Sequence, residues 1–206
     1  MHTIITGTGR CGTSYVQKAL GHLGVLASHE TVFTIDGPSH RNAETFEVEV
    51  GFLAGAHLGE PWLEGVRVVH LVRQPQRVIR SFLRMGFWQD APGFWPYWRW
   101  AENYVPELKE AETPLEKAAI WVTRWNRRIE PYADLRWRVE DDVRGLLDWL
   151  GVGYRGKSIF ADTSYNTRSN LDLEPEWGIL DAALQADIET LMADYGYTDL
   201  RGAEHG

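Results

Sequence analysis

The sequence has a single cysteine, Cys11, and no apolar run long enough to cross a membrane. One thiol cannot form an internal disulfide, and no secretory signal segment is visible, so we expect a cytoplasmic protein without integral membrane association. Positive charge is also scarce, because 21 Lys and Arg residues face 29 Asp and Glu residues, for a formal net charge of -8. Nucleic acid is therefore not an expected partner, and any polyanion has to be bound locally.

Internal repeats, low-complexity blocks and long runs of Ser, Gly or Pro are missing as well. No such segment marks a domain boundary, and 44% of the residues are hydrophobic, which is enough for a full-sized core. We therefore expect one domain over residues 1–206. The seven histidines show no i, i+4 spacing, and no paired cysteines accompany them, so we predict no metal site.

Predicted strands and helices alternate along the chain. Short apolar and β-branched runs predict strands at residues 4–5, 25–27, 66–72 and 135–139. Helical periodicity and capping residues predict helices over about residues 15–23, 75–85, 113–128, 141–151 and 181–195. This alternation favours the α/β class, as a three-layer α/β/α fold with a mostly parallel sheet covered on both sides.

The segment Gly7 to Ser14 (GTGRCGTS) lies between the first predicted strand and the first predicted helix. Glycines at such a turn allow the backbone N–H groups to converge on an anion, so a phosphate-type ligand is expected. A P-loop for ATP or GTP needs Lys after its second glycine, but Thr13 holds that position. It also uses an Asp at a nearby strand end for Mg²⁺, where this chain has Arg73. A cation inside the loop, Arg10, suits a ligand that is bound without metal.

Two alternatives for this turn remain open. The same string fits the G-x-G-x-x-G pattern of dinucleotide binders, and Glu30 follows 18 residues after Gly12, where a ribose-binding acid belongs. The segment could also be a tight turn without a ligand.

Cys11 would begin a helix like a phosphatase nucleophile, but Gln17 stands where the arginine of a Cys-x5-Arg loop is needed, so we interpret Cys11 as a small loop residue.

A second anion anchor is predicted at the end of the strongest strand. Arg73 follows residues 66–72 at the edge of the sheet where ligands of α/β proteins bind, and Ser81 comes eight positions later on the next helix. Both side chains can face one anion. Arg77, Arg80 and Arg84 share that helix, and we expect them to form a solvated basic face.

Together, two motifs resemble those of the sulfotransferases that use 3'-phosphoadenosine 5'-phosphosulfate (PAPS). Residues 7–15 (GTGRCGTSY) are similar to the family's 5'-phosphosulfate loop, and residues 69–84 (VHLVRQPQRVIRSFLR) are similar to its 3'-phosphate motif. The sequence departs from the first motif at Gly9, where the family often has Pro, and at Cys11, where it often has Ser. The resemblance implies a P-loop nucleotide-hydrolase-like fold. It also implies transfer of a sulfuryl group, without metal, to a hydroxyl or amine, with 3',5'-adenosine bisphosphate as the product.

The resemblance assigns nucleotide-binding residues position by position. The residues that would bind the 5'-phosphosulfate are Gly9, Arg10, Cys11, Gly12, Thr13 and Ser14. Arg73 and Ser81 would bind the 3'-phosphate, and Arg168 would close over the nucleotide from a late loop. Charge develops on the departing phosphate oxygen during transfer, so Arg10 would also take part in catalysis.

A base is expected after the second predicted strand. Related sulfotransferases place a catalytic Glu or His in the stretch after the first helix, and Glu30 and His29 occupy it here. Adjacent side chains of an extended segment point in opposite directions, so we expect one of the two to face the reactants. Glu30 is the preferred base and His29 the alternative.

Residues 86–112 are rich in aromatic side chains. They are either a satellite core under an irregular loop, or a lid that stacks on a small-molecule, sugar or lipid-like acceptor. The aromatic residues that crowd this segment are Phe87, Trp88, Phe94, Trp95, Tyr97, Trp98 and Trp100.

Two rival functions stay open beside sulfuryl transfer: an atypical P-loop kinase and a nucleotide-binding module without catalysis.

Overall fold

The structure is a computed structural model, which describes residues 1–89, 92–153 and 174–197. The chain divides into two compact units. Among the described residues, the first unit comprises 1–73 and 126–153, and the second comprises 74–125 and 174–197. Both units are therefore built from segments that lie far apart in the sequence.

A parallel sheet forms the centre of the first unit. Its strands are β1 (Thr3–Thr6), β2 (Ala27–His29), β5 (Val48–Val50), β6 (Arg67–Val72) and β7 (Leu135–Arg138). They lie in the order β2-β5-β1-β6-β7, and every neighbouring pair is parallel. Ile5 pairs with Val50 on one side and Val69 on the other, and all three side chains are fully buried. A small antiparallel sheet follows β2, formed by β3 (Phe33–Thr34) and β4 (Gly37–Pro38).

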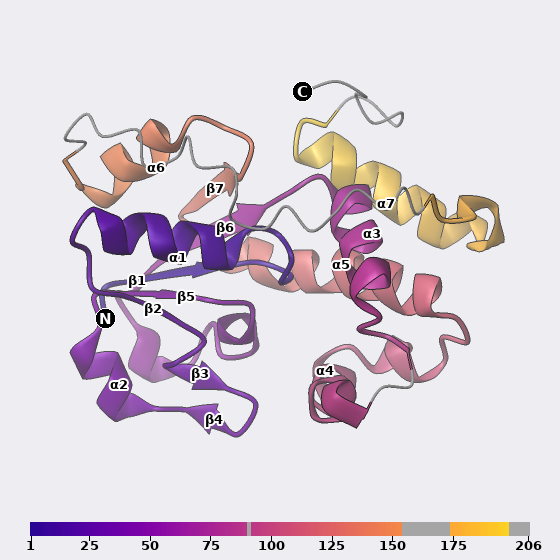
Figure 1. The fold of residues 1–206 in the computed structure, drawn as a ribbon, viewed down its shortest axis with the longest axis horizontal. Coiled ribbons are helices and arrows are strands. Elements are labelled where there is room, and N and C mark those ends of the chain that lie inside the picture. Colours follow the sequence, from indigo (N-terminus) through magenta and orange to yellow (C-terminus); the bar gives the residue numbers. More distant parts are fainter. Residues whose placement is uncertain (90–91, 154–173, 198–206) are drawn as a thin grey trace. The chain divides into compact units, whose positions relative to one another are not determined.

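Helices flank this sheet. In the first unit they are α1 (Thr13–His22), α2 (His40–Thr45) and α6 (Val143–Leu150), with the 3-10 turns η1 (Leu53–Ala56), η2 (Pro61–Leu63) and η5 (Glu130–Tyr132). Helix α1 packs against β2 and β5 (Figure 1). The Asp142 side chain caps α6 at its start, and Gly151, with φ 75°, ends it. The predicted α/β class with a mostly parallel sheet is confirmed, and the arrangement fits a three-layer α/β/α fold.

The second unit is helical in its described residues. It contains α3 (Pro75–Met85), α4 (Trp95–Tyr104), α7 (Ala182–Asp194) and the 3-10 turns η3 (Pro92–Phe94), η4 (Pro106–Lys109) and η7 (Trp177–Ile179). Helix α5 (Pro114–Ile129) begins in the second unit, and its residues from Asn126 onward belong to the first. Thr113 and Glu116 form the predicted capping box at its start, each accepting a hydrogen bond from the other's backbone N–H.

Aromatic side chains form the core of the second unit. Trp121 and Trp125 stack with their ring centres 4.4 Å apart, and Trp100 meets Trp125 edge-on at 5.4 Å. Phe87 and Trp88 are also buried. Three aromatic residues of the predicted aromatic segment, Phe87, Trp88 and Trp100, are therefore core residues of this unit. Trp95 of the same segment is 44% exposed.

Several short elements lie at other positions than predicted or were not predicted. The strand expected at residues 25–27 lies two positions later as β2, and Leu26 is 58% exposed in the turn before it. Helix α4 occupies a segment expected to be irregular, because its proline lies in the first helical turn, where a missing N–H costs nothing. Strand β5 was not predicted. In the described ranges, no helix is both long and apolar enough to span a membrane.

Candidate functional site

The loop between β1 and α1 has the backbone of an anion-binding turn. Gly9, Arg10 and Gly12 have positive φ angles of 73°, 57° and 106°. Left-handed backbone in a tight turn can bring successive N–H groups to one side of the chain. Gly12 is the N-cap of α1, no side chain caps the helix there, and its first turn holds no acidic residue. The positive end of the helix dipole therefore faces this loop.

The loop lies at the centre of the sheet edge. From β1 the chain runs outward to β2, returns through β5 and then crosses to β6 on the other side of β1. The turn after β1 is therefore at the point where the strand order reverses, where open α/β sheets bind ligands. The surroundings leave no space for larger residues in the loop, since a Cβ on Gly12 would lie 2.7 Å from Cγ2 of Val139. A Cβ on Gly7 would meet the Leu71 carbonyl oxygen and the Cys11 Sγ.

Arg73 lies against this loop. It directly follows β6, and its Nη1 donates a hydrogen bond of 3.2 Å to the Arg10 carbonyl oxygen. Cys11 is buried beside it, and burial raises the pKa of the thiol to about 11, although the Arg73 charge acts in the opposite direction. The thiol is therefore protonated at neutral pH and is not a nucleophile.

His29 contacts the hydroxyls at the start of α1. Its Nε2 lies 3.2 Å from Thr13 Oγ1 and 3.2 Å from Ser14 Oγ. Burial, with the nearby charge of Lys18, lowers the pKa of His29, so the imidazole is neutral at neutral pH. The ring therefore links the end of β2 to the loop and orients the two hydroxyls.

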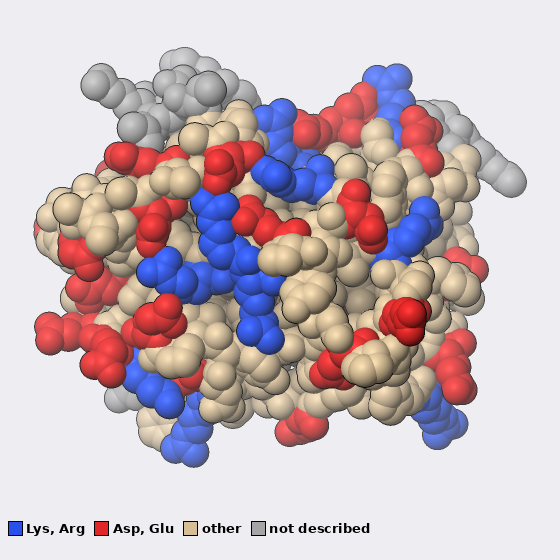
Figure 2. Space-filling model, turned by 180° about the vertical axis from the view of Figure 1, so that it is seen from behind, with Lys and Arg blue, Asp and Glu red and all other residues tan. Residues whose placement is uncertain are grey.

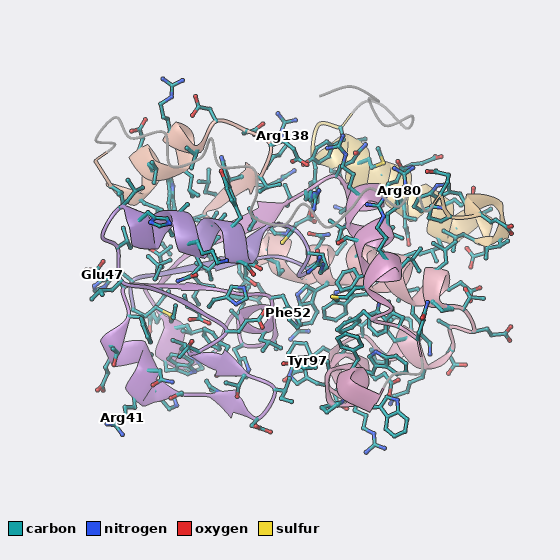
Figure 3. The ribbon with its side chains drawn as sticks, in the orientation of Figure 1. Arg41, Glu47, Phe52, Arg80, Tyr97 and Arg138 are labelled. Atoms are coloured by element: carbon teal, nitrogen blue, oxygen red, sulfur yellow. The ribbon has the colours of Figure 1, made fainter. Side chains whose placement is uncertain are left out.

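Glu30 is the next residue, and its carboxyl has a different environment. It has φ 53°, and the N–H of Phe52 donates a hydrogen bond to its carboxyl. Figure 3 labels Phe52, whose ring also lies against Gly9. Burial raises the pKa of Glu30 to about 7, with a further contribution from the charge of Glu49. A carboxyl that titrates near neutral pH is suited to accept a proton from a reactant.

Arg10 and Glu30 share an unusual backbone conformation. Among the described residues, they are the two that are not glycine and have positive φ. A left-handed residue with a side chain costs about 1–3 kcal/mol, and such residues gather at functional sites. The two strained residues lie on turns that leave parallel strands at the same edge of the sheet. Both were predicted site residues, Arg10 as the cation of the glycine-rich turn and Glu30 as the base that the resemblance places after the second predicted strand.

The other predicted residues are distributed as follows. Ser81 is half-buried on α3 of the second unit. Arg168 lies outside the described residues. Arg77 and Arg84 are exposed, as expected for a solvated face, whereas Arg80 forms an ion pair of 2.6 Å with Glu174. Within residues 1–89, 92–153 and 174–197, no group of three or more His, Cys, Asp or Glu side chains is arranged to hold a metal ion.

Glu49 contributes to the site but was not predicted from the sequence. Glu49 is fully buried on β5 and adjusts the charge state of Glu30. Its signal was a single acid between two valines (Val48-Glu49-Val50), a pattern that is typical of a half-exposed strand. Nothing in that alternation shows that both faces of the strand are covered.

On the face drawn in Figure 2, Lys and Arg side chains have Asp and Glu side chains as neighbours. Comparison with known proteins adds no further assignment, since no family model and no curated protein sequence matches the chain.

Proposed function

We propose that the protein is a PAPS-dependent sulfotransferase whose first unit is P-loop nucleotide-hydrolase-like. The observation that carries the proposal is the composition of the β1–α1 loop. It combines converging N–H groups and an uncapped helix start with Arg10, Arg73 and the hydroxyls of Thr13 and Ser14. The loop has neither the lysine nor the strand-end aspartate that a kinase uses with Mg²⁺.

The proposal assigns the two anionic ends of the nucleotide to different residues. The loop from Gly9 to Ser14 would hold the 5'-phosphosulfate through its N–H groups, its hydroxyls and the Arg10 guanidinium. Arg73 would hold the 3'-phosphate, to which the resemblance also assigns Ser81. The hydrogen bond from Arg73 to the Arg10 carbonyl supports this assignment in part, because it keeps the Arg73 guanidinium beside the loop.

PAPS supplies a sulfuryl group that is transferred in line, so that a bond from sulfur to the acceptor oxygen or nitrogen forms while the bond to the 5'-phosphate oxygen breaks. Arg10 would stabilise the negative charge left on that phosphate oxygen. Glu30 would take the proton that the acceptor loses, and its raised pKa makes it effective near neutral pH. His29 is the less suitable base because its Nε2 is directed to Thr13 and Ser14.

The acceptor is expected to be a small molecule, sugar or lipid-like compound with a hydroxyl or amine. The formal net charge of -8 argues against a highly charged polysaccharide.

Calorimetry with three ligands tests the proposal. We expect 3',5'-adenosine bisphosphate to bind, and ATP with Mg²⁺ and NAD(H) not to bind. Arg10→Ala should weaken the binding of the bisphosphate, and Arg77→Ala, which changes an exposed arginine of α3, is the matched control. Binding of ATP with Mg²⁺ but not of the bisphosphate would overturn the proposal in favour of a kinase. Binding of the bisphosphate without transfer to any of a panel of hydroxyl and amine acceptors would indicate a nucleotide-binding module.

A further inference from the structure

Glu49 is a carboxylate in the interior of the parallel sheet. It lies on β5 between Val48 and Val50, and its side chain is fully buried (0% exposed). In Figure 3, Glu47 and Phe52 mark the two ends of the segment that carries it. An ionisable group in such a place costs free energy unless hydrogen bonds compensate for its lost hydration. An apolar side chain would fill this position more favourably, so the contacts of Glu49 indicate another role.

The donors to Glu49 come from one short segment. The Ser28 hydroxyl on β2 donates to Oε2, and the Thr31 N–H donates to Oε1 at 3.0 Å. The N–H groups of Val32 and Phe33 donate to the same carboxylate. Ser28 is also the register partner of Glu49 in the parallel pair of β2 and β5. Because these donors flank the turn that follows β2, the carboxylate holds this turn from both sides.

That turn carries Glu30 in its left-handed conformation. The residue after β5 also limits where the Glu30 side chain lies, since a Cβ on Gly51 would be 2.7 Å from the Glu30 Cγ. Phe52, the next residue, donates its N–H to the Glu30 carboxyl. One short stretch of chain therefore anchors the turn, leaves room for the side chain and binds its carboxyl.

Glu49 also acts on Glu30 through its charge. Burial is the main cause that raises the pKa of Glu30, and the charge of Glu49 is the second. Burial raises the pKa of Glu49 itself, while its hydrogen bonds lower it. His29, the neighbouring titratable group, faces α1, where burial and the charge of Lys18 lower its pKa. Two carboxyls that interact in this way titrate as a pair.

We infer that Glu49 is the positioning residue of Glu30: it fixes the turn that presents the Glu30 carboxyl to the acceptor, without itself touching a reactant. Its negative charge makes the Glu30 carboxyl a stronger base. The inference rests on the proposed function, because Glu30 acts as a base only if a group is transferred to an acceptor that loses a proton.

Substitutions at Glu49 test the inference in a transfer assay. Gln keeps an oxygen that accepts hydrogen bonds and removes the charge, whereas Ala removes both. We expect Glu49→Ala to lower kcat about a hundredfold, because a misplacement of about 1 Å costs that much, and to leave the affinity for 3',5'-adenosine bisphosphate unchanged. We expect Glu49→Gln to move the acidic limb of the pH profile of kcat to lower pH. Glu47→Gln, at an exposed glutamate just before β5, is the matched control.

A carbon-13 NMR titration of the glutamate carboxyls gives a readout that does not require turnover. The Glu30 signal is assigned by its absence in Glu30→Gln. The pKa of Glu30 should be lower in Glu49→Gln than in the wild type, and it should be unchanged in Glu47→Gln. An unchanged titration of Glu30 in Glu49→Gln would overturn the inference, as would a wild-type kcat in Glu49→Ala. If Glu49→Ala does not fold, Ser28→Ala takes its place, since it removes one donor and leaves the carboxylate; an unchanged kcat there counts against the inference.

The two proposals fail in different ways. If the wild-type protein binds no 3',5'-adenosine bisphosphate, the proposed function is wrong. The NMR titration still measures whether Glu49 acts on Glu30 in that case. If the bisphosphate binds and is formed during transfer, but substitutions at Glu49 change neither kcat nor the titration, only the positioning role is wrong.

Discussion

The two units of the protein bury different kinds of side chain. The first buries Glu49, Ser28 and His70 on strands of its sheet, whereas the second surrounds Trp121 and Trp125 with other aromatic rings. Buried polar groups are costly unless every partner is in place, and a satisfied polar network fixes one arrangement. Packed aromatic rings contribute stability through the area that they bury. We infer that the buried groups of the first unit hold side chains in fixed positions, whereas those of the second unit mainly contribute to stability.

The largest effect is expected from opening the aromatic core. Trp121→Ala should lower the free energy of unfolding by about 3–5 kcal/mol, because it leaves a cavity beside the rings of Trp88, Trp100 and Trp125. Urea denaturation measures the loss. Trp95→Ala, at a residue that is 44% exposed, is the control and should change stability by no more than about 0.5 kcal/mol. Equal losses for the two variants would contradict the role assigned to the second unit.

The next effect concerns the chemistry of the first unit. Arg10→Ala should reduce turnover about 10²–10³-fold, since it removes a preorganised donor at the developing charge, an effect of about 2.7–4 kcal/mol on the barrier. Its free energy of unfolding should stay close to that of the wild type. Steady-state transfer assays and urea denaturation, each repeated on Arg77→Ala, measure both quantities. A large loss of stability with unchanged turnover would show that Arg10 serves stability, which contradicts the role assigned to the first unit.

The smallest effect is a change of stability with pH. The pKa of Glu30 rises from its ordinary value of 4.5 to about 7 on folding, so between these values the folded protein holds a proton that the unfolded chain releases. Stability therefore falls as the pH rises through this window. Glu30→Gln does not titrate and should be more stable than the wild type at about pH 8, on the order of 1–3 kcal/mol, with a smaller difference at about pH 5.

Urea denaturation of the wild type, Glu30→Gln and Glu47→Gln at both pH values makes this measurement. Glu30→Gln should also lose transfer activity, so that one substitution raises stability and lowers function. A difference in stability that does not depend on pH would show that Glu30 has the same pKa in the folded and unfolded chain. The buried polar groups of the first unit would then lower the free energy of unfolding less than the comparison between the units implies.

Helices α3 and α6 were predictable because their ends carry local signals. Pro75 in the first turn and Gly86 at the end set the bounds of α3, and Asp142 and Gly151 do the same for α6. Each signal acts within a few residues of the helix that it ends. The sequence therefore contains it whatever the rest of the chain does.

The short strands were less predictable because tertiary burial decides them. Ser28 and Glu49 are polar, yet both are buried as register partners in neighbouring strands. At the site, the residue types of Arg10 and Glu30 were recognisable from chemistry and from a resemblance. Their left-handed backbone was not, because local preference at such angles favours glycine. The hydrogen bonds and packing that hold those conformations come from β5 and β6, which are distant in sequence.

Helix α5 is one continuous helix, although its residues up to Trp125 belong to the second unit and those from Asn126 onward to the first. A protease needs several residues of extended chain in its cleft, and a hydrogen-bonded helix does not offer them. Limited digestion should therefore leave this crossing uncut. A gene truncated between the two positions would produce fragments that each end in half a helix.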